Sequence, residues 1–387
     1  MAISIEEGTL HDPDQAWVDD FLDRLLALWR QHADTPTGLF NPYLDRQWRH
    51  HVDGPRTLVT QCRLIYNFAR AFERSGDQGY GELARRGIDA LVRYFHDADE
   101  DGWVWACRAD GSVEDDAYDA YGHAFVILAL ATAATVFEDS RYRDLALQTW
   151  EFMQRRFRDH HGGLIWHIGR DGKILDDVRS QNPLMHTFEA LLVLAPLDES
   201  GTVRREAAQM WHFLRERMPD PGCLPEWYDA DWQPLEAGER AIVEVGHAFE
   251  WAFLLSEARE LFPEEDLLEP GRLLLAFGMR HGYDAAEGGV FSRVDFEGRL
   301  LERRKGWWEQ CEAIRAMQRY AARHGATEIV EPLRHSIKFA RRHFVDEEYG
   351  GWYLSPPGAG GEPSLLKGNV YKLDYHVVNM CRELLAN

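Results

Sequence analysis

The sequence predicts an all-α fold, an (α/α)6 barrel with short β-hairpins at the mouth that carries the active site. Three observations predict it. A glycine beside aromatic residues returns about every 60 residues, a period typical of repeat architectures. Amphipathic and largely apolar helical segments alternate between these glycines. A polar motif opens the apolar segments about 20 residues after the glycines.

The glycine motif occurs six times, and an aromatic residue follows each glycine within a few positions. Its glycines are Gly38, Gly102, Gly163, Gly222, Gly289 and Gly351. Two helices and one hairpin account for about 60 residues. An open superhelix is the alternative to a closed ring. The count of six and the absence of a capping sequence favour closure, with residues 1–387 forming a single domain.

The segments between the glycines have helical periodicity. Residues 16–29 and 83–95 place apolar side chains at i, i+3 and i+4, as amphipathic helices do. Residues 142–157 show the same pattern, and residues 58–72 show it with fewer charges. Residues 124–136 are almost wholly apolar, as expected of a helix buried on all sides. Amphipathic outer helices therefore alternate with apolar inner helices.

Hairpin signals lie between an outer helix and the next inner helix. Short aromatic or apolar segments are followed by Asp-Gly or Glu-Gly turns at residues 106–113, 168–174 and 294–300. We expect these hairpins to lie at the end of the barrel where the inner helices begin.

Composition excludes several functional classes. The net charge of −22 repels phosphate backbones, so nucleic acid is not an expected partner. The first residues, Met1–Glu7, lack a basic-then-apolar signal sequence, and no apolar run approaches the roughly 20 residues of a membrane span. Five scattered cysteines form no CxxC pair. We expect a cytoplasmic monomer or homodimer with no membrane partner.

The polar motif places one residue of each unit at a matching position. These residues are Arg63, His123, His186, His247, Trp308 and His376. In a closed barrel, the N-terminal ends of the inner helices face one cavity. A single histidine is more often a core residue, but several ionisable groups gathered in a cleft indicate a functional site.

The residue types suit proton transfer on a sugar. Imidazole, with an ordinary pKa near 6.5, accepts or donates a proton at neutral pH. The permanent charge of Arg63 would stabilise an oxyanion such as an enediolate. His186 and His247 each have a glutamate three residues later, on the same helix face. Glu189 could orient an imidazole, bind a sugar hydroxyl, or be a buried and paired helix residue. The 14 Trp and 14 Tyr provide flat faces that suit sugar rings.

Other chemistries have weaker support. The sequence has no His-Glu-x-x-His metal motif, and the Glu-x-x-His order of di-iron bundles is reversed here. A Gly-x-Ser-x-Gly elbow and a phosphate-binding glycine loop are also missing. Asp115, Asp116 and Asp119 are candidates for a glycosidase carboxylate pair, but they equally fit a solvated helix entry. We expect neither a metal nor a cofactor.

Six short motifs resemble those of the N-acylglucosamine 2-epimerase superfamily. They are Thr60–Arg63, Tyr121–Phe125, Asn182–His186 with Glu189, Gly246–Trp251, Trp307–Gln310 and Tyr375–His376. The resemblance extends from about Leu58 to Leu385. This superfamily includes mannose isomerases, cellobiose 2-epimerases and N-acylglucosamine 2-epimerases, and its fold is an (α/α)6 barrel.

The resemblance implies a role for each site residue. His247 and His376 are implied as the acid/base pair, and Arg63 as the residue that stabilises the enediolate. The residues implied in sugar binding, ring opening or stacking are Asn182, His186, Glu250 and Trp308. His123, at the matching position of its own unit, is added as a further sugar-binding candidate.

The expected activity is aldose–ketose isomerisation within this single catalytic domain. It would convert free mannose, or relatives such as lyxose, to fructose or xylulose through a metal-free cis-enediolate. His123 and the Leu184–His186 segment differ from the corresponding cellobiose epimerase motifs, which favours a monosaccharide. A 2-epimerase acting on glucose and mannose, or on N-acylglucosamine and N-acylmannosamine, is the alternative. A glycoside hydrolase and a non-catalytic carbohydrate-binding barrel are further alternatives.

Overall fold

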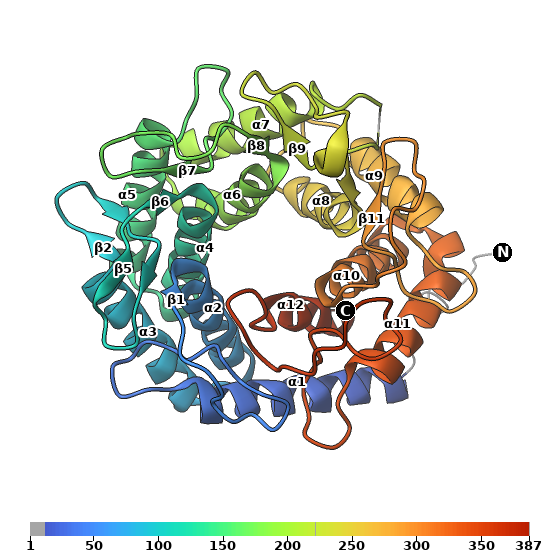
Figure 1. Cartoon of the computed structure of the whole chain (residues 1–387), viewed down its shortest axis with the longest axis horizontal. Coiled ribbons are helices and arrows are strands. Elements are labelled where there is room, and N and C mark those ends of the chain that lie inside the picture. The colour runs from blue at the N-terminus through green and yellow to red at the C-terminus, as the bar shows by residue number, and fades with distance from the viewer. Residues whose placement is uncertain (1–11, 221, 387) are drawn as a thin grey trace.

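The computed structural model describes residues 12–220 and 222–386, so the Met1–Glu7 segment lies outside the described residues. Within them, twelve α-helices form two concentric rings, which confirms the predicted (α/α)6 barrel (Figure 1). The inner ring consists of α2 (Leu58–Ser75), α4 (Ala120–Phe137), α6 (Gln181–Leu194), α8 (Val245–Ala258), α10 (Trp307–His324) and α12 (Tyr375–Leu385). The outer ring consists of α1 (Asp12–Ala33), α3 (Gln78–Phe95), α5 (Ser140–Arg156), α7 (Thr202–Arg215), α9 (Leu268–His281) and α11 (Val330–Phe344).

The inner helix α4 shows why the inner ring is apolar. Its residues are almost all buried against α2, α6 and α5. By length and composition it is also the one helix of the described chain that could cross a membrane, but 78% of it is buried in the barrel. The Asp119 side chain caps its start by accepting a hydrogen bond from the Gly122 N–H at 2.5 Å. A helix buried in this way is a core element of the barrel.

Short strands join each unit to the next. The pairs are β1 (Arg56–Thr57) with β4 (Ala106–Cys107), β6 (Tyr118–Asp119) with β7 (His167–Ile168), β8 (Arg179–Ser180) with β9 (Trp227–Tyr228), and β10 (Val243–Glu244) with β11 (Arg293–Val294). In each pair, the residues just before an inner helix bond to the hairpin segment of the following unit. The antiparallel ladders therefore hold the starts of neighbouring inner helices in register.

The predicted hairpins are confirmed. Strand β4 pairs with β5 (Val113–Asp115), and bridges join Ile168 to Ile174 and Val294 to Leu300. A further hairpin pairs β2 (His96–Asp97) with β3 (Gly102–Trp103). The hairpins lie at the mouth from which the inner helices begin.

The first and last units meet and close the ring. A backbone bridge joins Leu44 to Gly368, and the Trp29 indole donates a hydrogen bond to the Asp374 carboxylate at 2.9 Å. In Figure 1, α12 lies beside α2 and α1 passes beneath both. The expectation of closure, rather than an open superhelix, is confirmed.

In four of the six glycine motifs, those of Gly38, Gly102, Gly222 and Gly289, the glycine allows the loop to pack closely on the next outer helix. A Cβ at Gly102 would lie 2.5 Å from the Phe152 ring of α5. Gly289 has a φ of +72°, and a Cβ there would lie 2.5 Å from the Phe339 ring of α11. A larger residue would force the loop away from the helix, which explains why the motif is built on glycine.

Candidate active site

The N-terminal ends of all six inner helices surround one cavity of about 610 Å³. Its floor and walls carry Arg63 from α2, Asn182 and His186 from α6, and His247 from α8. Segments 304–309 and 354–371 complete the wall, the second of them just before α12. The repeat therefore brings residues from distant parts of the sequence to one mouth, as predicted.

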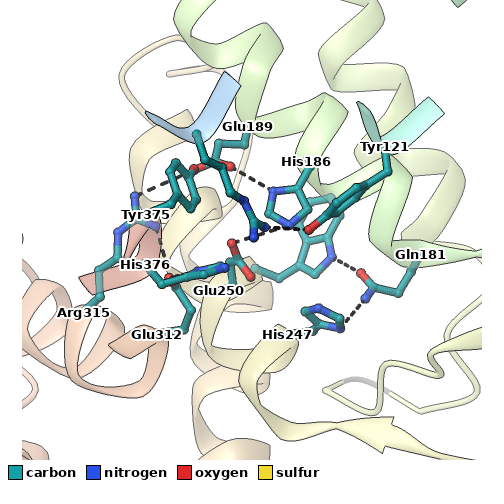
Figure 2. Close-up of polar contacts among 12 residues, drawn as sticks. Tyr121, Gln181, His186, Glu189, His247, Glu250, Glu312, Arg315, Tyr375 and His376 are labelled. Carbon is teal, nitrogen blue, oxygen red and sulfur yellow. Dashed lines mark hydrogen bonds and ion pairs between the residues drawn. The ribbon is translucent and has the colours of Figure 1, made fainter. Parts of the chain in front are cut away.

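Each of the three histidines that line the cavity has a carboxylate at its Nδ1 (Figure 2 shows two of the pairs). The Nδ1–Oε distances are 3.1 Å for His186–Glu189, 2.6 Å for His247–Glu226 and 2.7 Å for His376–Glu312. A carboxylate at Nδ1 fixes the tautomer and leaves Nε2 to act on a ligand. The sequence singled out all three histidines but not Glu226 or Glu312.

The three carboxylates differ in what balances their charge. Arg315 contacts both Glu312 and Glu189, at 3.2 and 3.9 Å. The Tyr375 hydroxyl also donates to Glu189 at 2.6 Å. Glu226 instead accepts from the neutral groups Ser180 Oγ and Gln181 Nε2, at 3.0 and 2.8 Å. Glu226 thus presents more uncompensated negative charge to its histidine.

The environments separate the pKa values of His247 and His376. Burial alone would lower the pKa of His247, but the Glu226 carboxylate, with further contributions from Glu244 and Glu309, outweighs burial and raises the pKa above its usual value. Burial, assisted by the nearby Arg63 charge, lowers the pKa of His376 well below its usual value. A pair of titratable groups with pKa values moved apart is typical of an acid and a base that work together.

Arg63 keeps its charge available to a ligand. Its Nη1 donates to the Tyr371 carbonyl at 2.7 Å and its Nη2 donates to the Tyr121 hydroxyl at 2.6 Å. No carboxylate of the described residues lies within ion-pair distance of it, and its Nε has no hydrogen-bond partner. The guanidinium is therefore fixed by neutral groups and can stabilise an oxyanion in the cavity.

Two buried polar groups at the cavity have no protein partner. Both carboxyl oxygens of Glu250 and Oδ1 of Asn182 are without a hydrogen bond. Burial, together with the neighbouring Glu312 and Glu189 charges, raises the pKa of Glu250 well above its usual value. This shift favours the protonated, neutral form of Glu250. Buried groups without hydrogen-bond partners are rare, and here both residues line the cavity.

Trp308 lies at the wall between the two histidines of the acid/base hypothesis. Its ring centroid is 4.7 Å from that of His247 and 5.8 Å from that of His376. This position suits the predicted stacking role beside a ligand.

The structure corrects the hypothesis that His123 binds a sugar. Its Nδ1 contacts the Asp119 carbonyl at 2.7 Å, and its Nε2 accepts from the Trp103 N–H at 3.1 Å. Its ring stacks on Phe152 and is fully buried outside the cavity lining. His123 holds the glycine loop of its unit against α5. From the same motif, Tyr121 faces the cavity instead.

The carboxylates proposed for a glycosidase do not reach the cavity. Asp115 and Asp116 are exposed, and Asp119 caps α4 while it also accepts from the Trp166 indole at 3.0 Å. None of these three residues lines the cavity. The helix entry is therefore the better interpretation of this segment, solvated at Asp115 and Asp116 but buried at Asp119.

Two buried groups in the described chain have enough donors close together to be considered for a metal. They are His186, Glu189 and Glu250, and Glu250, Glu312 and His376, with ligand atoms within 4.8 Å of one another. Arg315 already pairs with Glu189 in the first group and with Glu312 in the second. A cation beside these carboxylates opposes a metal ion, so this donor set fits proton transfer better.

Comparison with known proteins identifies the family of the chain. The sequence profile of N-acylglucosamine 2-epimerase (GlcNAc 2-epimerase) matches residues 38–380. The chain belongs to this family. The D-mannose isomerase of Thermobifida fusca is 29% identical, over 91% of each chain. The D-mannose isomerase of Marinomonas mediterranea is 26% identical, over 96% of this chain and 97% of its own.

A solved structure shows the same fold. The crystal structure of a D-mannose isomerase superposes with a TM-score of 0.87 and 24% identity, covering 96% of this chain and 97% of that chain. The resemblance found in the sequence motifs is thus confirmed at the level of family and fold. The family member described here is an enzyme of the isomerase and epimerase class.

Proposed function

We propose that the chain is an aldose–ketose isomerase that interconverts free mannose, or relatives such as lyxose, with fructose or xylulose. The observation that carries the proposal is the convergence of His247, His376 and Arg63 on one cavity. Two imidazoles with separated pKa values and one uncompensated guanidinium are the groups that an enediolate reaction needs.

The proposed chemistry can be assigned to the side chains of this cavity. Glu250, His186 and Asn182 bind the sugar and assist ring opening. One histidine takes the C2 proton, the electron pair of the broken C–H bond forms the C1–C2 double bond, and Arg63 stabilises the enediolate oxygens. For the ketose, the O2 hydroxyl proton passes to O1 and the proton from C2 is returned to C1, so that C2 becomes the carbonyl carbon; return of that proton to the other face of C2 gives the epimer. The same residues thus serve both outcomes, and 2-epimerisation is the alternative function.

Isomerisation is favoured because near-full-length relatives with this domain are D-mannose isomerases. We extend the proposal to the whole chain as one catalytic domain that needs no metal. We also propose a cytoplasmic monomer or homodimer, in keeping with five buried cysteines that form no disulfide.

The charge of the cavity favours an unphosphorylated sugar. Its acidic lining residues are Glu226, Glu244, Glu250, Glu309 and Glu362, and its basic ones are Arg63, Arg293 and Arg304. Arg293 is bonded to Glu244 at 2.6 Å, and Arg304 to Glu302 at 3.3 Å. A phosphate dianion would therefore find little free positive charge near the mouth.

Proton NMR of the purified enzyme with mannose tests the proposal. The proposal predicts that fructose appears as the first product. Glucose appearing first, without fructose, would replace it with 2-epimerisation. Mannose that stays unchanged under conditions where the enzyme is folded would reject both.

A further inference from the structure

Glu226 differs from the carboxylates of the other two histidine pairs in its place in the chain and its partners. It lies in the loop before β9, in the unit that precedes its partner, and 4% of it is exposed. Its backbone N–H donates to the Ile242 carbonyl at 3.0 Å, and its carbonyl accepts from the Gln181 N–H at 3.3 Å. These two hydrogen bonds fix the backbone of Glu226 between the start of α6 and the segment before β10, independently of its contact with His247.

A chain of hydrogen bonds fixes the direction of this carboxylate. The Trp251 indole can only donate, and it donates to Gln181 Oε1 at 2.8 Å. The Gln181 Nε2 must then face the other way, where it lies 2.8 Å from both Glu226 Oε2, to which it donates, and His247 Nδ1. The Ser180 hydroxyl donates to the other oxygen, Oε1, at 3.0 Å. All three donors are neutral, so none cancels the carboxylate charge.

The other charges around His247 leave this effect in place. Glu244 on β10 and Glu309 on α10 add negative charge, while Arg293 is paired with Glu244 at 2.6 Å. Burial raises the pKa of Glu244 to about 7, so its charge is partial at neutral pH. Within α8, the raised pKa of Glu250 favours its neutral form. On α6, burial lowers the pKa of His186, so this histidine adds little positive charge.

We propose that Glu226 is a positioning residue for the proposed isomerisation: it fixes the His247 ring with Nε2 toward the cavity and makes His247 the proton donor of the pair. This assignment rests on the proposed function. The carboxylate partner of His376 differs, because Arg315 contacts Glu312 at 3.2 Å and compensates its negative charge. Arg315 balances the charge of Glu312 beside His376, whereas no arginine of the described residues pairs with Glu226 beside His247. This difference assigns the two histidines different roles in proton transfer.

The pH profile of Glu226→Gln tests the proposal. Glutamine keeps the shape and removes the charge, so the protonated form of His247 should be lost at lower pH. We expect the alkaline limb of kcat to move down by about one pH unit or more, since an adjacent opposite charge changes a pKa by roughly 1–3 units. KM should change by less than about threefold, because Glu226 acts through His247. Glu226→Asp keeps the charge and should stay nearer the wild-type profile.

An NMR titration of the histidine rings in the resting enzyme separates this proposal from the proposed function. The His247 midpoint should fall in Glu226→Gln, whatever sugar the enzyme converts. Glu383→Gln is the matched control, because it removes an equally buried carboxylate that is bonded to Arg319 at the opposite end of the barrel. That variant should leave the midpoint and the pH limb unchanged. An unmoved His247 midpoint or an unmoved alkaline limb in Glu226→Gln would overturn the assignment.

Discussion

Glutamates of this cavity have different surroundings although they are one residue type. Glu226 accepts hydrogen bonds from two neutral donors and faces a histidine. Glu250 has no hydrogen-bond partner, and burial together with neighbouring carboxylates raises its pKa and so favours its neutral form. A neutral acid can donate a hydrogen bond to a sugar oxygen, which an ionised carboxylate cannot do.

Glu250 therefore tolerates glutamine better than alanine. Glu250→Gln keeps a donor of the same shape, and we expect kcat/KM to remain within about tenfold of wild type. Glu250→Ala removes the donor and should lower kcat/KM by about 100-fold or more, within the range found when a binding or proton-transfer group is removed. Steady-state kinetics with mannose measure both. Equal losses in the two variants would show that the ionised form is required.

Loss of either acid/base histidine should abolish most turnover. His247→Asn and His376→Asn should each lower kcat by about 10²–10⁴-fold, the usual contribution of a general acid or base. His123→Asn serves as the control. His123 lies outside the cavity and bonds backbone groups, so its variant should lose thermal stability rather than kcat per folded enzyme. Near-normal rates in either catalytic variant would contradict the mechanism.

The sequence could indicate the cavity histidines because each lies near the start of a helical segment that follows a glycine motif. It could not predict Glu226 or Glu312, because each meets its histidine only after two distant segments pack together. The one feature of the sequence that could have indicated Glu226 is its place in the fourth glycine motif, between Pro225 and Trp227. The prediction for His123 was wrong because a shift of two residues on a helix turns the side chain by about 200°. Tyr121 thus faces the cavity and His123 faces the outer ring.

At the scale of elements, a buried ion pair closes several glycine loops. An aspartate at the start of the loop bonds a cation that follows 20 or 21 residues later in the chain. The pairs are Asp159–Arg179 at 3.3 Å, Asp284–Lys305 at 2.8 Å and Asp346–Lys367 at 2.8 Å. Each pair ties the glycine loop to the segment that leads into the next inner helix. The ion pairs thereby position the ends of the helices that carry the site.

The Asp346 pair should make stability depend on pH. Although burial acts in the other direction, Arg46 and Lys367 hold the pKa of Asp346 well below its usual range. The ionised form therefore stabilises the fold above the unfolded pKa of about 4. Asp346→Asn should cost about 3–5 kcal/mol near pH 7, because it leaves Lys367 buried without its partner.

Urea unfolding at several pH values measures this difference. The gap between wild type and Asp346→Asn should be complete above about pH 5 and should narrow as the pH falls below about 4. Glu331→Gln, which changes an exposed ion pair with Arg334, should alter the unfolding free energy by less than about 1 kcal/mol. A gap that does not change with pH would show that the Asp346 charge is not the cause.

The helices and hairpins were predictable because their signals are local. Apolar periodicity distinguishes α3 from α4 in the sequence itself, and the Asp-Gly turn marks the hairpin of β4 and β5. The pairing of β1 with β4 in the following unit was not predictable, because it depends on how two units pack. The aspartate–cation pairs repeat at a fixed spacing and were visible in the sequence, yet only their contacts show that they are pairs.

At the scale of the whole molecule, closure of the helical ring positions His376, and the negative net charge affects which sugars can enter the cavity. The ring closes through the Leu44–Gly368 bridge and the bond from Trp29 to Asp374, so α12 and His376 depend on contacts with the first unit. The count of six glycine motifs predicted this closure. The protein has a net charge of −22, and two of the three arginines that line its cavity, Arg293 and Arg304, are paired with glutamates. The enzyme should therefore discriminate against anionic sugars.

Mannose 6-phosphate tests this discrimination. Its kcat/KM should be at least about 100-fold below that of mannose at low ionic strength, and added salt should narrow the difference by screening the charges. A 6-deoxy sugar of the same configuration controls for loss of the hydroxyl group without added charge. Efficient conversion of mannose 6-phosphate would contradict the assignment of an unphosphorylated substrate.

The most direct test of proton transfer by His247 and His376 is deuterium incorporation from D₂O into sugar, followed by NMR with EDTA-treated enzyme and mannose. The wild type should produce fructose that contains deuterium from solvent, and His376→Asn should show neither conversion nor deuterium above background. Conversion that EDTA abolishes and added metal restores would contradict proton transfer by the two histidines. So would full conversion and incorporation by His376→Asn.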